Sequence, residues 1–128
     1  MSQQHRNAGR ESLIELCVRE EPMRTWVTVI GELDLSTADA FDRCLWEAQT
    51  HSRRVVLDLR GLVFIDSAGL RSVLAARLRA INWHHRLDVL CGTGQVRRML
   101  SISGFDQLIK VIEPPGSPEM DSAEQAAA

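Results

Sequence analysis

The sequence predicts an α/β domain in which a mixed β-sheet carries helices mainly on one face. Five short apolar runs with strand character alternate with three stretches whose apolar residues recur at helical spacing. The composition, 45% hydrophobic and 25% charged, is typical of a globular protein, and 128 residues give room for one domain. The predicted order is β-β-α-β-α-β-α-β, a hairpin followed by strands that are connected through helices and partly parallel.

The first half of the predicted domain is a hairpin followed by a helix. Residues 13–19 and 26–30 have strand character, and a turn that contains Pro22 joins them. Ser36 precedes Asp39 by three positions, a spacing that resembles the capping box at the start of a helix. The helix that follows has one apolar face, formed by Phe41, Cys44, Leu45 and Ala48.

The second half of the predicted domain alternates strands and helices. Strands are predicted at residues 54–59, 87–91 and 108–112. Two helices lie between them, and the second should end at Gly104 in the left-handed conformation. Their apolar faces are marked by Leu70, Val73, Leu74, Leu78 and Ile81 in the first, and by Val96, Met99 and Leu100 in the second.

The folded unit is expected to span residues 12–113. The polar residues 1–11 and the proline-led residues 114–128 are expected to be flexible tails. No apolar run reaches the roughly 20 residues of a membrane-spanning helix. The N-terminus also lacks the apolar centre of a signal peptide. We therefore expect a cytoplasmic protein that does not bind membranes.

Charge and cysteine content exclude further classes. Fifteen basic and seventeen acidic residues give a net charge of −2, whereas proteins that bind nucleic acids through phosphates usually carry a basic excess. We expect no direct nucleic-acid partner. The three cysteines, Cys17, Cys44 and Cys91, form no CxxC motif and indicate neither a disulfide framework nor a metal site. No cofactor is expected.

Working groups in such a sheet usually follow the carboxyl ends of strands, which directs attention to residues 31–36, 60–67 and 91–95. The second of these loops ends in Asp66-Ser67 at a predicted helix start. Either side chain could act as the N-cap. A serine there also lies beside unpaired backbone N–H groups that would stabilise an attached phosphate, and Arg71, one turn further, could pair with it.

A series of motifs resembles the STAS family, the domain of bacterial anti-sigma-factor antagonists and of sulfate-transporter tails. The resemblance extends from about Leu13 to Ile112. The motifs are Gly31-Glu32-Leu33-Asp34, Val55-Val56-Leu57-Asp58-Leu59, Phe64-Ile65-Asp66-Ser67-Ala68-Gly69-Leu70, Val96-Arg97-Arg98-Met99-Leu100 and Gly104-Phe105. A free-standing STAS chain of this length is similar to an anti-sigma-factor antagonist. The resemblance thus implies a role in regulating sigma-factor-dependent transcription.

The resemblance also implies a partner, an anti-sigma factor that is a serine kinase. Ser67 corresponds to the serine that such a kinase phosphorylates to switch the antagonist off, and Asp66 to the aspartate before it. Ala68 departs from the family, which usually has a second hydroxyl there. Asp66 and Gly69 would shape the turn. Mg-ATP would belong to the kinase, and the chain itself would not be an enzyme.

Two further residues are expected at the partner-binding surface together with Asp66, Ser67 and Gly69. Arg71 would border this surface. Asp34 corresponds to an aspartate that the family places after the second strand, near the phosphorylated serine. An equally good interpretation makes Asp34 a loop residue that precedes a helix start.

Alternatives stay open. The chain could be a STAS scaffold subunit of a stress-sensing or lipid-transport complex. The spacing of Cys91 and Arg97 is also that of cysteine-dependent phosphatases, in which a loop wraps a phosphate around a thiolate nucleophile. A second catalytic aspartate loop is not evident, so a buried Cys91 thiol is the preferred interpretation. The chain could also associate weakly with copies of itself.

Overall fold

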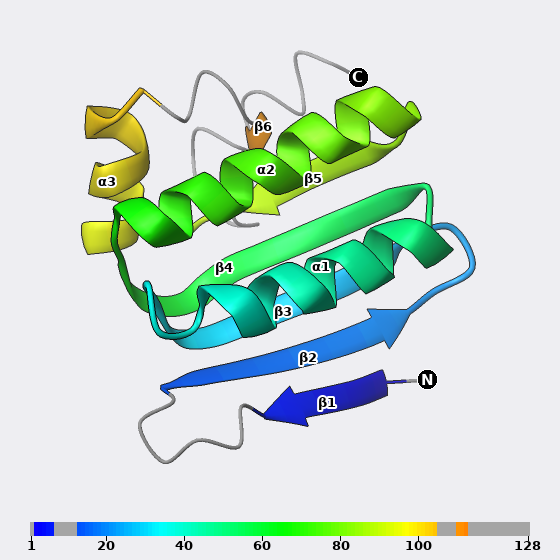
Figure 1. The fold of residues 1–128 in the computed structure, drawn as a ribbon, viewed down its shortest axis with the longest axis horizontal. Helices are drawn as coiled ribbons and strands as arrows, with labels where there is room; N and C mark the ends of the chain where they lie inside the picture. The colour runs from blue at the N-terminus through cyan, green and yellow to red at the C-terminus, as the bar shows by residue number, and fades with distance from the viewer. Residues whose placement is uncertain (1, 7–12, 105–109, 113–128) are drawn as a thin grey trace, which may run out of the picture.

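The computed structural model describes residues 2–6, 13–104 and 110–112. Within these residues the chain forms one six-stranded sheet in the order β1-β2-β3-β4-β5-β6, accompanied by helices (Figure 1). The strands are β1 (Ser2–Arg6), β2 (Ile14–Glu20), β3 (Thr25–Leu33), β4 (Arg54–Ile65), β5 (Arg86–Leu90) and β6 (Lys110–Ile112), and the helices are α1 (Ala38–His51), α2 (Ser67–Trp83) and α3 (Gln95–Ile102). The predicted α/β class is confirmed, and one strand is added before the predicted hairpin.

The sheet is mixed, as predicted. Strands β1, β2 and β3 pair antiparallel, and β3, β4, β5 and β6 pair parallel. The carboxyl ends of β3, β4 and β5 therefore lie at the same end of the sheet, and each is followed by the start of a helix. The predicted site residues follow the strands at this end.

The added strand, β1, lies in a segment expected to be a flexible tail. Its residues pair with β2, so that Ser2 lies opposite Arg19 and Arg6 opposite Glu15. The expectation for residues 1–11 is therefore wrong for Ser2–Arg6. An edge strand can be held by main-chain hydrogen bonds alone, and a wholly polar sequence gives no alternating pattern from which to predict it. The predicted tail at 114–128 lies outside the described residues.

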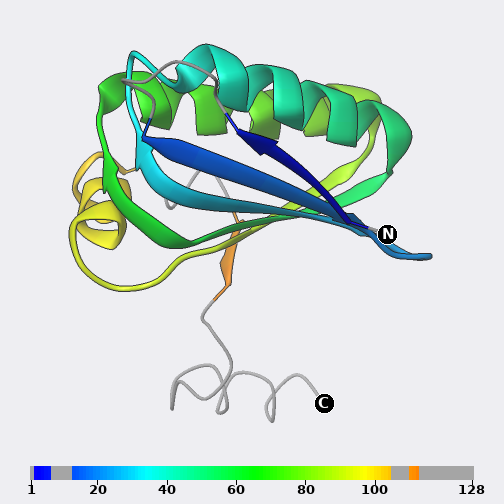
Figure 2. The ribbon, with the colours of Figure 1, turned by 90° about the horizontal axis from the view of Figure 1, so that it is seen from below.

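Helices α1 and α2 lie side by side on one face of the sheet, and α3 lies at its end beside β4 (Figures 1 and 2). The hydrophobic core fills the space between this pair of helices and the sheet. The predicted apolar face of α1 is confirmed. Fully buried core residues include Val27, Val29, Leu57 and Val89 from the strands and Phe41, Leu45, Val73, Ala76 and Ala80 from the helices.

The strands that lead to the site are longer than predicted. β4 continues well beyond the expected 54–59 and takes up most of the predicted loop 60–67. β3 runs through Gly31 instead of ending there, with φ of +110° at that glycine. A Cβ at this position would overlap the main-chain oxygen of Leu13. Two register shifts between β3 and β4 interrupt the alternation that would have revealed the longer strands.

The buried face of α2 differs from the prediction. Leu78 and Ile81, which were expected in the core, are about half exposed. The residues that α2 buries are mostly smaller: Gly69, Leu70, Ser72, Val73, Ala76 and Ala80. Small side chains let the helix approach the sheet closely, and Leu78 and Ile81 lie on the side that faces away from the sheet. Helix α3 ends as predicted, with Gly104 in the left-handed conformation just after it.

Candidate functional site

The start of α2 assigns different tasks to its two polar residues. The Asp66 backbone is extended, and its carboxylate Oδ1 accepts a hydrogen bond from the Gly69 N–H at 3.0 Å. Asp66 is therefore the N-cap. Ser67 is the first residue of the helix and is exposed. Among the described residues, none forms a hydrogen bond with the Ser67 hydroxyl, which is thus free of a capping role.

Gly69 allows the first turn of α2 to pack against the ends of β3 and β4. It is buried, and a Cβ on it would lie 2.5 Å from the Leu33 carbonyl oxygen and 2.8 Å from Ile65 Cγ1. The Asp66 N–H donates to the same Leu33 carbonyl at 3.2 Å. Only glycine fits this contact without a shift of the main chain. The position of Ser67 is thereby tied to the sheet.

Gln95 fixes the end of β4 from the other side and was missed in the sequence. It is the first residue of α3, and its Oε1 accepts from the Ile65 N–H at 3.0 Å. Its Nε2 donates to the Ile65 carbonyl, also at 3.0 Å. The side-chain amide thus pairs with Ile65 as a neighbouring strand would. Nothing in the local sequence around Gln95 signals this contact, because its partner is distant in the chain.

Asp34 organises the loop between β3 and α1. Its Oδ1 accepts hydrogen bonds from the Ser36 hydroxyl at 2.7 Å, from the Ser36 N–H at 2.9 Å and from the Thr37 N–H at 3.3 Å. The bond from the Ser36 hydroxyl is the main reason why the pKa of Asp34 lies below its ordinary value. The loop interpretation of Asp34 is therefore supported by its contacts.

The predicted capping box is wrong. α1 begins at Ala38, after Ser36, and its N-cap Thr37 makes no side-chain capping bond. Ser36 instead donates to Asp34, as described above, and Thr37 Oγ1 donates to the Glu32 carbonyl at 2.9 Å. The pattern predicts that the Ser36 hydroxyl accepts a main-chain hydrogen bond at the helix start. In the structure the Asp34 carboxylate is the acceptor in this loop.

The structure brings Asp34 and Asp66 together at one shallow hollow of about 370 Å³. Leu35, Ser36 and Phe64 also line it. Leu35 is 78% exposed and Phe64 is 39% exposed, which is unusual for large apolar side chains. Two carboxylates and two exposed apolar side chains therefore lie close to the start of α2. This arrangement has the mixed character of a protein-binding surface.

Arg71 lies one turn beyond Ser67 on α2 and is exposed. It forms no ion pair with any residue of the described ranges. Its guanidinium is thus available to a phosphate on Ser67 or to a partner. At neutral pH a phosphate would carry roughly −1.5 to −2 charges, so it would add repulsion toward carboxylates on this surface.

The Cys91 loop does not have the geometry of a phosphatase. Cys91 is completely buried and belongs to the hydrophobic core. A thiolate nucleophile must be reached by solvent and by substrate, and burial in the core closes this thiol off from the surface. Within the described ranges, no three potential ligand side chains gather into a metal site. Nor does any helix of these ranges have the length and apolar character needed to cross a membrane.

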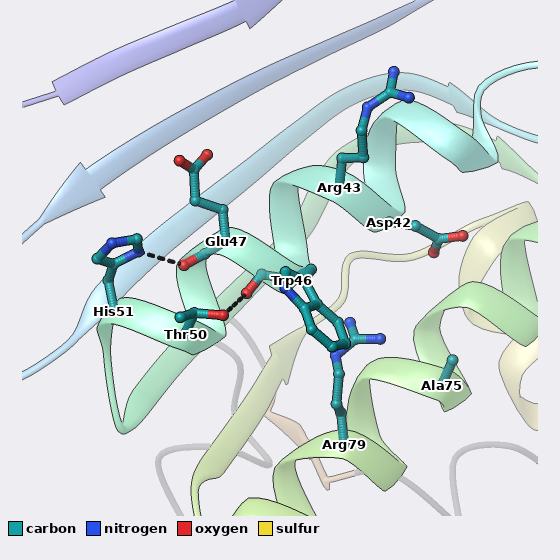
Figure 3. A pocket seen from close by; sticks show the side chains of 8 residues that line it. All are labelled: Asp42, Arg43, Trp46, Glu47, Thr50, His51, Ala75 and Arg79. Carbon is teal, nitrogen blue, oxygen red and sulfur yellow. Dashed lines mark hydrogen bonds between the residues drawn. The ribbon is translucent and has the colours of Figure 1, made fainter.

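A second hollow, of about 670 Å³, lies between α1 and α2 (Figure 3). Arg79 from α2 stacks on Trp46 from α1, with its guanidinium carbon 5.1 Å from the ring centre, and its Nε donates to Gln49 at 2.9 Å. Trp46 also meets Trp83 edge to face at 5.1 Å. These groups are engaged with one another, so we interpret the hollow as a seam of helix packing.

Comparison with known proteins agrees with this geometry. A family model described as Mlab, STAS domain matches residues 17–112. The chain therefore belongs to the STAS family, and the resemblance seen in the sequence is confirmed. A STAS-domain containing protein of Pseudomonas aeruginosa (strain UCBPP-PA14) is 28% identical over 85 residues, which cover 66% of this chain and 84% of that protein.

Solved structures show the same fold. An anti-sigma factor antagonist from Mycobacterium paratuberculosis matches with a TM-score of 0.71 and 23% identity, covering 94% of this chain and 97% of that one. The anti-sigma factor antagonist SpoIIAA in its unphosphorylated form matches with a TM-score of 0.65 and 18% identity, covering 86% and 96%. Bacillus SpoIIAA in the phosphorylated form matches with a TM-score of 0.61 and 16% identity, covering 88% and 99%.

Proposed function

We propose that this chain is an anti-sigma-factor antagonist controlled by phosphorylation of Ser67. In its unmodified form it binds a cytoplasmic anti-sigma factor that is also a serine kinase, and the sigma factor is released. The observation that carries the proposal is the division of roles at the start of α2. Asp66 caps the helix, so the exposed Ser67 hydroxyl has no structural task and is accessible to a kinase.

The surroundings of Ser67 explain how a phosphate could stop binding without unfolding the domain. Inside the domain, the free N–H groups of the first turn and the Arg71 guanidinium favour a negative charge. At an interface, the phosphate would join Asp34 and Asp66 beside apolar Leu35 and would lose its water. Placing such a charge in the interface should weaken binding by about 2 to 5 kcal/mol, which is roughly 30-fold to several thousand-fold in affinity.

The fold likeness to SpoIIAA is consistent with this switch. SpoIIAA has been solved in an unphosphorylated and in a phosphorylated form, and this chain matches both forms over most of its length. The likeness supports a scaffold on which such a modification can be carried. The residues that would respond to it here are the ones described at the start of α2.

Phosphorylation with candidate partners tests the proposal. The purified chain is incubated with Mg-ATP and anti-sigma factors of the serine kinase type, and the phosphate is mapped by mass spectrometry. We expect one phosphate, on Ser67, and none on the Ser67→Ala variant. Ser67→Glu should fold normally and bind the partner weakly in titration calorimetry. Ser101→Glu places the same charge on another exposed helical serine and should bind normally.

Two results would contradict the proposal. A phosphate on another residue would remove Ser67 from the mechanism. Equal affinity of Ser67→Glu and the wild type would show that charge at this helix start does not control binding.

A second candidate is a STAS scaffold subunit of a stress-sensing or lipid-transport complex. The description of the matching family model, which names Mlab and not an anti-sigma factor antagonist, favours this candidate. The same surface would then hold a permanent partner, and Ser67 would contact it without being modified. Stable co-purification with a transporter subunit, together with no phosphate transfer from any anti-sigma kinase, would favour this candidate over the first.

A further inference from the structure

A row of residues along the outer side of α2 begins at Ser67. Its members, Ser67, Arg71, Leu74, Leu78 and Ile81, follow one another at intervals of three or four, which places them on one side of a helix. We call this row the α2 stripe. Leu78 is 55% exposed and Ile81 is 52% exposed. The stripe thus joins a modifiable serine and an arginine to an apolar patch.

The opposite side of α2 explains why these large residues face outward. The helix buries Gly69, Ala76 and Ala80 against the sheet, together with Leu70 and Val73. The core on this side of the molecule is complete without the stripe. Leu78 and Ile81 lie in neighbouring turns, so their exposed parts form one continuous apolar surface, and large surfaces of this kind mark interaction sites.

Charge indicates what kind of surface would cover the stripe. α2 contains three arginines and no aspartate or glutamate. Arg79 is engaged with Trp46 and Gln49 on the α1 side, whereas Arg71 lies in the stripe and is exposed. The positive end of the helix dipole adds to this charge near Ser67. The complementary surface is apolar and carries carboxylates at the end that faces Arg71.

We propose that the anti-sigma kinase partner lies along the whole α2 stripe and not only against its Ser67 end. The partner buries Leu78 and Ile81 under an apolar surface and places a carboxylate opposite Arg71. This inference rests on the proposed function, because the partner must reach Ser67 to phosphorylate it. The helical rise puts Leu78 roughly 16 Å and Ile81 roughly 21 Å from Ser67. A contact area of about 800 Å² is roughly 32 Å across, so an interface centred near the middle of α2 reaches both ends of the stripe.

As a consequence, the residues that bind the partner would be separate from the residue that is phosphorylated. Leu78 and Ile81 would hold the partner at a distance from the modified hydroxyl, so a phosphate on Ser67 would weaken one end of the interface and leave the other end intact. A change in the apolar part should therefore raise the Kd of the complex and the KM of phosphorylation, and leave kcat unchanged.

The test replaces Leu78 by glutamine, which keeps a side chain of similar size and a high helix propensity. Binding of the kinase that phosphorylates this chain is measured by titration calorimetry, and phosphorylation by steady-state kinetics. We expect Leu78→Gln to raise Kd about tenfold, because a polar amide would replace an apolar side chain that the partner buries. Met23→Gln is the matched control, because Met23 is 81% exposed and lies at the turn before β3. Its Kd should stay within about twofold of the wild type, and melting curves should show both variants folded.

The outcomes separate this inference from the function on which it rests. If Leu78→Gln binds as tightly as the wild type while Ser67→Glu does not, the stripe is not part of the interface and the proposed function stands. If sedimentation shows a dimer that Leu78→Gln dissociates, and the affinity for the kinase is unchanged, the stripe binds a second copy and the inference is overturned. If the wild type binds no anti-sigma kinase, the proposed function is overturned and this inference with it.

Discussion

Replacing Gln95 by leucine would remove both hydrogen bonds that hold Ile65 to α3. Ile65 is completely buried, so water cannot easily take the place of the lost amide. Each buried main-chain group left without a partner costs about 1 to 3 kcal/mol, and partial relaxation of the loop offsets some of this. We therefore expect Gln95→Leu to lower the free energy of unfolding by about 2 to 4 kcal/mol.

The effect should also be visible locally. In hydrogen exchange, the Ile65 amide should lose protection more than the amides of β3 do, because its acceptor is the Gln95 side chain. Under the proposed switch, the phosphorylation rate of Ser67 should change as well, since that residue follows Ile65 closely in the chain. Urea unfolding followed by circular dichroism measures the stability, and exchange detected by NMR measures the local opening.

A second variant shows whether hydrogen bonding is the cause. Gln95→Glu keeps an acceptor for the Ile65 N–H but places a negative oxygen against the Ile65 carbonyl. This repulsion raises the pKa of the new carboxyl above its value in the unfolded chain. As the pH falls the carboxyl is protonated and the repulsion disappears, so the variant should regain stability relative to the wild type. Unchanged stability of Gln95→Leu, or a Gln95→Glu deficit that does not depend on pH, would refute this account of the contact.

Three further predictions concern the site. Gly69→Ala should lower the free energy of unfolding by about 1 to 3 kcal/mol, because its Cβ meets main chain, whereas Gly92→Ala should be nearly neutral since its Cβ makes only ordinary contacts; a neutral Gly69→Ala in urea unfolding would contradict the close packing. Asp66→Ala should cost about 1 kcal/mol and Ser67→Ala almost nothing, as thermal melts can show, and the reverse order would make the serine the cap. Asp34 has a lowered pKa, so the stability that its carboxylate contributes is present above the unfolded pKa and is lost as the pH falls through the folded pKa. The stability difference between the wild type and Asp34→Asn should accordingly shrink on acidification, and a difference that grows would refute the sign.

The class of fold was predictable because it depends on the spacing of apolar residues, which can be read directly from the sequence. Alternating apolar runs and helical spacing predicted every element from the hairpin to α3. The strand β1 escaped because its residues are polar on both faces and are held by main-chain bonds. The full length of β4 escaped because the register shifts against β3 break the alternation that a regular strand would show.

The site was predictable only in part. Asp66-Ser67 before a helix could be recognised locally, but the choice of cap needed coordinates, since both residues have suitable oxygens. Gln95 could not be predicted, because its amide bonds to main-chain atoms whose chemistry is the same in every residue. Leu78 and Ile81 were wrongly predicted to be buried. Apolar residues at helical spacing show that they share one face of the helix, but when that face is broad the spacing does not show which part of it contacts the sheet.

The separate roles of Asp66 and Ser67 have a consequence for how such a domain can change over time or by design. Because the aspartate alone closes the helix start, the neighbouring position is under no folding constraint beyond tolerance of a first helical turn. Under the proposed switch, a single codon change there would lock the protein in its binding state or in its silent state, and a cysteine there would allow chemical attachment. Signal and scaffold can therefore be altered independently within two adjacent residues.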